Sequence, residues 1–346
     1  MTEAIIEIIQ PDDWHVHLRE GKLLEVVSKY SFRINNRCIV MPNLETPIIN
    51  SELANKYKEQ IKKTFNNDTF IPLIPCYLTE NLDLKDFKYA LEKEIFIGAK
   101  LYPSNVTTNS NLGVNNIEKI YPALEILEQT NKNLLVHGEK LGDNIDFFDR
   151  EKYFIDDELN NIRKRFSSLK IILEHVSSKY GADFIAENEN IAGTITPQHM
   201  LITKEDVFLK NKINPHNFCM PIVKEQKDLI ALRKYACSGN EKFFLGTDSA
   251  PHEVIYKSAD LSAKPGIFSS PCSIELYAEI FDEENSINNL EKFSSINGPN
   301  FYNLPINKRK IKIANKKWIL DEYTDEMGIK IKNFFGGKEL NWKVLK

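Results

Sequence analysis

Short runs of apolar and β-branched residues recur along the chain, and stretches with helical spacing separate them. Runs of this length and composition are typical of buried strands. The pattern occurs in Ile5–Ile9, Arg37–Met41, Thr69–Tyr77, Ile95–Leu101, Asn133–His137, Lys170–His175, Ile191–Thr196 and Lys242–Gly246. Strands that alternate with helices indicate parallel βαβ units, and eight strands suffice for a closed (β/α)8 barrel. The pattern therefore predicts an α/β protein with a TIM-barrel fold.

Amphipathic helices are predicted between these runs. From Ile117 to Leu127 the apolar residues follow the i, i+3, i+4, i+7 rule, and Pro122 predicts that the helix starts or kinks there. A second helical pattern comprises Leu229, Ile230, Leu232 and Ala236. An open doubly wound sheet is the alternative fold, but no glycine-rich phosphate-binding motif follows any of the runs.

After about Leu304 the pattern of apolar and polar residues changes. Three later stretches alternate like short strands, namely Trp318–Leu320, Ile329–Ile331 and Trp342–Leu345. We expect them to pack on the outside of the barrel. The prediction is one barrel domain over residues 1–346, with residues 305–346 as a C-terminal β extension.

Composition narrows the functional classes. The net charge of −4 gives no strong field toward nucleic acid or an anionic membrane. No apolar run approaches the ~20 residues of a membrane helix, and the N-terminus lacks signal-peptide features. The five cysteines are odd in number and widely spaced, which argues against a disulfide framework or a cysteine zinc site. We expect a cytoplasmic protein that binds neither nucleic acid nor membrane.

Reactive residues follow the apolar runs, where the active site of a (β/α)8 enzyme lies. Six of the seven histidines occupy such positions, and His216 is the exception. His15 and His17 form an H-x-H pair, whose side chains share one face of a strand roughly 7 Å apart and can reach one metal ion. His137 and His175 end neighbouring runs and could hold a second ion. Each histidine alone is also compatible with a buried, hydrogen-bonded imidazole.

Lys100 and Asp248 complete the candidate centre. Lys100 lies inside an apolar run, where a lone ammonium is costly unless it reaches solvent. Beside two metal ions its neutral form is favoured, and a neutral amine can add carbon dioxide to become an anionic, bridging carbamate. Asp248 follows the eighth run and could be only a helix N-cap. Facing the first strand, it could instead bind metal and transfer a proton.

Several motifs together resemble the amidohydrolase superfamily and, within it, the bacterial-type (class II) dihydroorotase family. They are PDDWHVHLRE, MPNLETP, AKLYPSNVTTNS, LLVHGE, LEHV, TITPQH and LGTDSAPH. They cover nearly the whole barrel, from about Pro11 to Phe268. One departure is Pro265, which falls near a position where the family offers a backbone N–H that proline lacks.

The resemblance implies a role for each matching residue. The implied metal ligands are His15, His17 and Asp248 for one zinc ion, and His137 and His175 for the other, with carboxylated Lys100 and a hydroxide bridging both. The implied substrate contacts are Arg19, Asn43 and His252 on a carboxylate, Thr107 and Thr108 in a mobile lid, His137, and the backbone of Met220. A planar guanidinium suits a carboxylate because it binds both oxygens.

The activity implied by the resemblance is the reversible closure of N-carbamoyl-L-aspartate to L-dihydroorotate in pyrimidine biosynthesis, by a homodimer with Asp248 as the catalytic proton carrier. Two alternatives stay open. Another cyclic amidohydrolase, such as a hydantoinase or allantoinase, would share the metal ligands, but Arg19, Asn43 and His252 favour a substrate with a free carboxylate. An inactive, dihydroorotase-like structural partner would typically lack metal ligands, and all six are present here.

Overall fold

Parallel strands form an eight-stranded barrel in the computed structural model, which describes residues 4–65, 70–210 and 212–345. The barrel strands are β2 (Asp12–Val16), β3 (Arg37–Val40), β4 (Ile71–Leu73) with β5 (Cys76–Tyr77), β6 (Gly98–Leu101), β7 (Asn133–Val136), β8 (Ile171–Leu173), β9 (Ile191–Ile195) and β12 (Phe243–Leu245). The ring closes between the first and last strands, because the N–H of Asp248 donates to His15 O at 2.9 Å and that of His17 donates to Ser249 O at 3.0 Å. The predicted barrel is confirmed.

The first barrel strand is β2, so the prediction that the apolar run Ile5–Ile9 fills this place is wrong. That run forms β1, which pairs antiparallel with β13 (Lys310–Ile319) outside the barrel. Most of β1 is exposed or half-buried, whereas every residue of β2 is buried. β2 can be polar and buried because its side chains have partners inside the protein, as when Asp12 accepts a hydrogen bond from Arg37 Nε at 3.0 Å.

The third barrel strand is interrupted. β4 pairs with β3, and β5 pairs with β6. Between the two pieces, the N–H of Ile97 donates to Ile74 O at 3.0 Å, so the backbone keeps its connection to the next strand. The predicted run began at Thr69, which lies outside the described residues.

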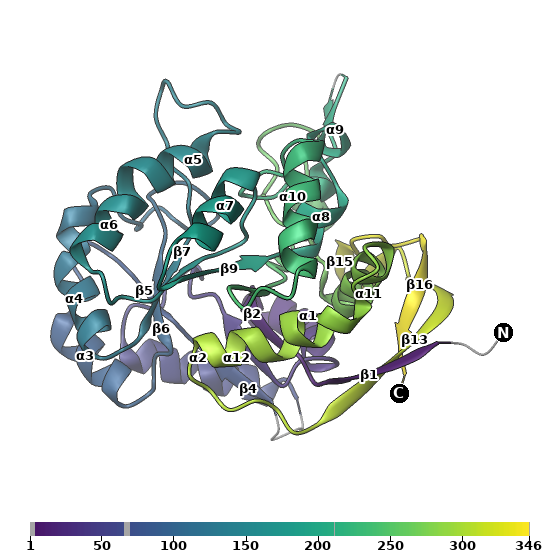
Figure 1. Ribbon diagram of the computed structural model, residues 1–346, viewed down its shortest axis with the longest axis horizontal. Helices are drawn as coiled ribbons and strands as arrows, with labels where there is room; N and C mark the ends of the chain where they lie inside the picture. The colour runs from purple at the N-terminus through teal and green to yellow at the C-terminus, as the bar shows by residue number, and fades with distance from the viewer. Residues whose placement is uncertain (1–3, 66–69, 211, 346) are drawn as a thin grey trace.

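Helices follow the strands and cover the outer face of the barrel (Figure 1). They are α1 (Gly21–Phe32), α2 (Ser51–Lys63), α3 (Leu84–Glu92), α4 (Tyr121–Gln129), α5 (Arg150–Phe154), α6 (Asn160–Arg165), α7 (Lys179–Glu187), α8 (Pro197–Leu201), α9 (Lys204–Val207), α10 (Gln226–Cys237), α11 (Ser273–Glu283) and α12 (Asn297–Phe301). α4 carries Pro122 in its first turn, which confirms the predicted helix start. In α10, Ile230 is 56% exposed, so its predicted place on the buried face is wrong.

Aromatic rings close the end of the barrel opposite the carboxyl ends of the strands. Trp14 of β2 stacks on Tyr302 at 4.5 Å between centroids and meets Phe244 of β12 edge-on at 6.2 Å. Gly298 in α12 is needed for this packing, since a Cβ there would lie 2.0 Å from Trp14 Nε1. The C-terminal part of the chain thereby supplies the floor of the barrel.

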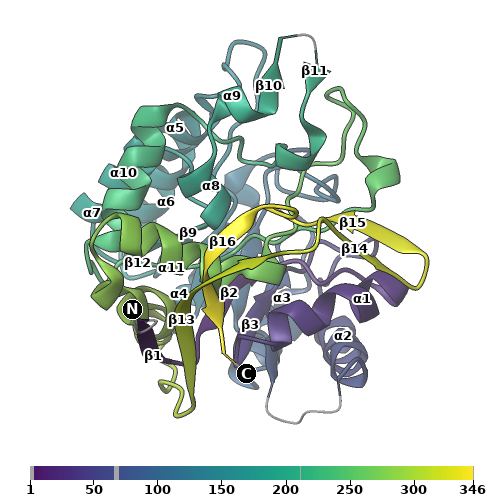
Figure 2. The same ribbon diagram turned by 90° about the vertical axis from the view of Figure 1, so that its right-hand side faces the viewer.

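A small antiparallel sheet lies outside the barrel and holds both ends of the described chain (Figures 1 and 2). Its strands are β1, β13 and β16 (Glu339–Val344), and two hairpins, β14 (Tyr323–Glu326) with β15 (Ile329–Lys332) and β10 (Phe208–Leu209) with β11 (Lys212–Ile213), stand apart from it. Trp318 Nε1 donates to Trp342 O at 2.7 Å, and Trp342 Nε1 donates to Asp282 of α11 at 3.2 Å.

Within the described residues, no helix is both long and apolar enough to cross a membrane.

Candidate metal and substrate site

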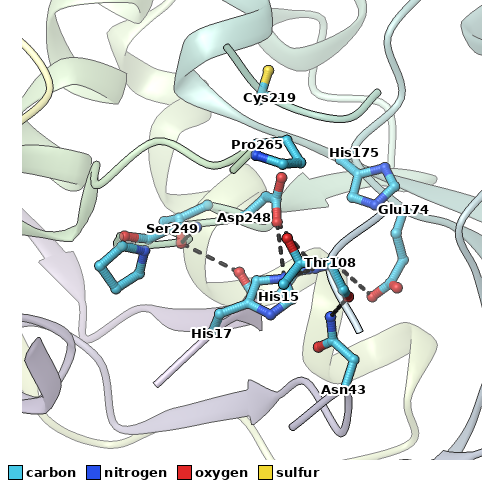
Figure 3. Close-up of polar contacts among 12 residues, drawn as sticks. His15, His17, Asn43, Thr108, Glu174, His175, Cys219, Asp248, Ser249 and Pro265 are labelled. Carbon is cyan, nitrogen blue, oxygen red and sulfur yellow. Dashed lines mark hydrogen bonds and ion pairs between the residues drawn. The ribbon is translucent and has the colours of Figure 1, made fainter. Parts of the chain in front are cut away.

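Two histidines and an aspartate converge at the carboxyl ends of β2 and β12, as Figure 3 shows. Asp248 Oδ1 lies 3.3 Å from His15 Nε2 and 3.2 Å from His17 Nε2, and the two Nε2 atoms are 3.3 Å apart. Ligand atoms from all three residues lie within 4.8 Å of one another. Imidazole and carboxylate ligands at this spacing suit a divalent cation such as zinc. The structure thus brings together three of the predicted metal ligands.

Barrel closure holds this cluster in place. Asp13 Oδ1 accepts hydrogen bonds from the N–H of Thr247 at 2.9 Å and of His15 at 3.1 Å, and Oδ2 accepts from Thr247 Oγ1 at 2.6 Å. Burial raises the pKa of Asp13 to about 6 although these hydrogen bonds oppose the shift. Asp248 itself has a φ of +44°, which costs a non-glycine residue about 1 kcal/mol. The surrounding hydrogen bonds over-determine that strained conformation.

His137 and His175 lie beside the cluster at the ends of β7 and β8. Their ring centroids are 4.6 Å apart, and that of His175 is 5.0 Å from that of His15. His137 Nε2 contacts Glu139 Oε2 at 2.7 Å, as metal-binding histidines commonly contact a carboxylate through one ring nitrogen. His175 Nδ1 is buried without a hydrogen-bond partner among the described residues. Because an unpaired buried nitrogen is costly, this donor set fits a bound metal.

The protonation states also suit metal binding. Burial lowers the pKa of His15, His137 and His175, and it lowers that of His17 to about 3. All four rings are therefore neutral at pH 7, the form that coordinates a metal. Burial would raise the pKa of Asp248, but hydrogen bonds with His15 and His17 hold it well below its usual range, so that the carboxylate is ionised.

Lys100 is fully buried on β6, and its Nζ pairs with Glu174, the residue before His175. Glu174 Oε1 also lies 3.0 Å from His15 Nδ1. Burial holds the pKa of Lys100 well below its usual range, which favours the neutral amine that can add carbon dioxide. The sequence does not single out Glu174, because both of its partners come from other strands.

A cavity opens at this cluster. In addition to His15, His17, His137, His175 and Asp248, its lining residues are Arg19, Asn43, Tyr102, Thr107, Thr108, Met220, Ala250, Pro265 and Gly266. The structure therefore brings the predicted substrate contacts to the cavity, except for His252, which lines an adjoining cavity together with Arg19, Asn43 and Thr108. Tyr102 and Gly266 belong to the wall, although no sequence signal marked them as substrate contacts.

His252 has two competing neighbours. Its Nε2 lies 3.1 Å from Arg19 Nη2 and 3.1 Å from Pro265 O. Burial holds the pKa of His252 well below its usual range, and a neutral ring nitrogen either accepts or donates, so only one of these hydrogen bonds forms at a time. The predicted departure at Pro265 is also visible, because this residue offers a carbonyl to His252, and the next N–H, that of Gly266, is bonded to Phe218 O at 2.8 Å.

His199 follows the seventh run as predicted, but it is turned to the backbone. Its Nδ1 pairs with Thr196 Oγ1 at 2.7 Å, and its Nε2 donates to Pro221 O at 3.0 Å. Burial lowers the pKa of His199 to about 4, so the ring is neutral at pH 7. Its position supports the segment that carries Met220 to the cavity.

No protein-family profile matches the chain. Its fold is shared with an L-hydantoinase from Arthrobacter aurescens, with which it aligns at a TM-score of 0.79 and 15% identity over 97% of this chain and 82% of the other. The barrel and its cluster of imidazole and carboxylate side chains define an α/β-barrel protein with a candidate metal site at the carboxyl ends of its strands.

Two closer relatives identify the family. The structure of dihydroorotase in complex with 5-fluoroorotic acid from Saccharomyces cerevisiae aligns at a TM-score of 0.91, with 31% identity over 99% of this chain and 98% of the other. The dihydroorotase of Buchnera aphidicola from Schizaphis graminum is 43% identical over 99% of this chain and 98% of its own length. The chain belongs to the dihydroorotase family.

Proposed function

We propose that this protein catalyses the reversible cyclisation of N-carbamoyl-L-aspartate to L-dihydroorotate and water, a step of pyrimidine biosynthesis. One observation carries the proposal: the guanidinium of Arg19 lies beside a cavity that also contains the cluster of His15, His17 and Asp248. A cyclic amide with an attached carboxylate can present both groups at once to such a cavity. Membership in the dihydroorotase family supports the same reaction.

Two zinc ions fit the donor groups. His15, His17 and Asp248 would hold one ion, His137 and His175 the other, and carboxylated Lys100 would supply an oxygen to each. When bound, the metal lowers the pKa of water toward ~7 and polarises an amide carbonyl, so that hydrolysis becomes feasible at neutral pH.

The chain's own residues orient the substrate and move the proton. Asp248 is the candidate base, because its ionised carboxylate lies at the cluster, and in hydrolysis it would accept a proton at Oδ and deliver it to the leaving ring nitrogen. Arg19 and the Nε2–H of His252 would both donate to the substrate carboxylate. That arrangement removes the competition at His252, since the carboxylate replaces Pro265 as the acceptor.

The segment with Thr107 and Thr108 is proposed as the lid. Asn43 Nδ2 donates to Thr108 O at 2.9 Å, and Asn109 Nδ2 donates to Asn43 O at 3.0 Å. Asn43, itself a predicted substrate contact, therefore holds the segment that contains Thr107 and Thr108.

Replacing both threonines by glycine should lower kcat about tenfold without loss of metal. Steady-state kinetics and metal analysis of the same preparation check this, and unchanged turnover would contradict the lid role.

The solution state is part of the proposal. We propose a homodimer that binds a small-molecule substrate and neither nucleic acid nor membrane. The net charge of −4 supports the absence of binding to nucleic acid or to an anionic membrane. Light scattering on the purified protein tests the dimer, and a monomer at assay concentrations would contradict it.

The decisive experiment follows the absorbance of dihydroorotate with zinc-loaded protein. Hydrolysis of dihydroorotate together with inactivity on hydantoin and allantoin, which lack the carboxylate, is the expected result. Turnover of hydantoin or allantoin alone would assign a different cyclic amide, and a stable protein without bound metal or turnover would favour an inactive structural role.

A further inference from the structure

The segment after His252 forms one wall of the substrate cavity and contains a buried lysine. Lys257 is 9% exposed, and it follows a short 3₁₀ helix, Val254–Tyr256. Its Nζ donates to Lys264 O at 2.9 Å and to Gly266 O at 2.5 Å. These two carbonyls flank Pro265, so the amine ties together the backbone that lines the cavity.

Other contacts leave this wall little freedom. Gly266 has a φ of +146°, and a Cβ there would meet Ala250 O at 2.3 Å, so the backbone approaches the end of β12 closely. Its N–H is bonded to Phe218 O, and Pro265 O faces His252 Nε2 at 3.1 Å. A shift of this wall would therefore move Pro265 O, the acceptor that competes with Arg19 for Nε2 of His252.

No carboxylate forms an ion pair with Lys257 among the residues that the structure describes, and the titratable groups that face it are Arg19, His216, Cys219 and His252. Burial lowers the pKa of Lys257 to about 7. A buried cation without a counter-ion is costly unless its hydrogen bonds serve the fold or the site, and both of its bonds go to the wall.

We propose that Lys257 is a positioning residue for substrate binding: its Nζ fixes the carbonyls of Lys264 and Gly266 and thereby places Pro265 against His252 at the carboxylate pocket. The inference rests on the proposed function for its substrate. The amine touches neither the metal ligands nor the cavity itself, so its loss should weaken substrate binding and leave the chemical step intact.

The test compares Lys257→Met with Lys242→Met. Lys242 is a matched control, because its Nζ also donates to backbone carbonyls, those of Ile185, Ala186 and Asn188, but it precedes β12 at the opposite end of that strand. Lys257→Met should raise KM for dihydroorotate about tenfold, with kcat within about twofold and metal content unchanged. Lys242→Met should leave KM unchanged.

Amide hydrogen exchange supplies a readout that needs no substrate. Exchange across residues 258–268 should accelerate in Lys257→Met and stay unchanged in Lys242→Met. Unchanged KM and exchange in folded Lys257→Met would overturn the inference, whereas a wild-type protein that fails to turn over dihydroorotate would overturn the proposed function alone. If Lys257→Met does not fold, Lys257→Gln keeps an N–H donor without charge and should give an intermediate KM; a wild-type KM would again overturn the inference.

Discussion

The two halves of the candidate metal centre are built differently. In the half between β2 and β12, the ligand atoms of His15, His17 and Asp248 already lie within 4.8 Å of one another. In the half between β6 and β8, Lys100 pairs with Glu174, and His175 Nδ1 has no hydrogen-bond partner in the described part of the chain. The first half is organised by the fold alone, whereas the ligand set proposed for the second half also requires carboxylated Lys100.

The cause of this difference is the hydrogen bonding beneath each half. Asp13 bonds to Thr247 and to the backbone of His15, so closure of the barrel sets the first half. In the second half, Lys100 pairs with Glu174, and an unmodified lysine offers no oxygen ligand beside His137 and His175. The following variants separate the two halves.

Asp248→Asn should produce the largest effect. The amide keeps the shape of the side chain but cannot accept the proton, so kcat should fall about 10³-fold while the fold and most of the metal remain. Stopped assays with metal analysis measure both quantities, and Asp325→Asn on the exposed side of β14 serves as the control. Near-normal turnover would remove Asp248 from the proton-transfer role.

Lys100→Met should affect the second half selectively. Methionine fills the buried volume but cannot become an anion, so we expect bound zinc to fall from about two ions to about one per chain and turnover to fall on the order of 10²-fold. Elemental analysis after gel filtration gives the stoichiometry. Retention of both ions would show that the carbamate is unnecessary, and loss of both would show that the halves are not independent.

Glu174→Gln and Glu139→Gln remove carboxylates that contact different parts of the centre. Glu174 contacts both His15 of the first half and Lys100 of the second, whereas Glu139 contacts His137 of the second half. Loss of a carboxylate behind a metal-binding histidine weakens metal affinity by about 10- to 100-fold. Competition with a chromophoric zinc chelator should show weaker binding of both ions in Glu174→Gln and of one ion only in Glu139→Gln. Identical titration curves for the two variants would contradict this assignment.

Arg19→Lys should have the smallest effect and should leave both halves intact. A lysine ammonium cannot replace the planar fork of the guanidinium, so KM for dihydroorotate should rise about tenfold while the metal content stays unchanged. Initial-rate kinetics measure this change. An unaltered KM would argue against the carboxylate contact.

Much of this site could be predicted because strand ends collect reactive side chains in a barrel. Lys100 lies within an apolar run that the structure confirms as a strand, and His137, His175 and Asp248 each come after such a strand. The first strand could not be found in this way, because the sequence Asp12–Val16 is buried although largely polar. Its carboxylates are satisfied by residues distant in sequence, and a hydrophobicity pattern contains no information about such partners.

The same limit applies to Glu174 and Lys257. In the sequence, Glu174 is only a carboxylate next to His175. The fold places Lys100 and His15 in contact with it. Lys257 lies outside every strand and helix that the sequence predicts, and only the structure shows its amine beneath the wall of the cavity. Local patterns predict which elements form, but they do not predict which side chains those elements enclose.

The hydrogen bond from Asp248 N–H to His15 O also links metal uptake to synthesis of the chain. Its two residues lie near opposite ends of the barrel sequence, so a nascent chain that still lacks β12 has two of the three groups for the first ion. A cation bound there stabilises only the completed ring, by mass action. In the proposed metal-bound enzyme, removal of the ion should accordingly lower the thermal stability of the protein as well as its rate of catalysis.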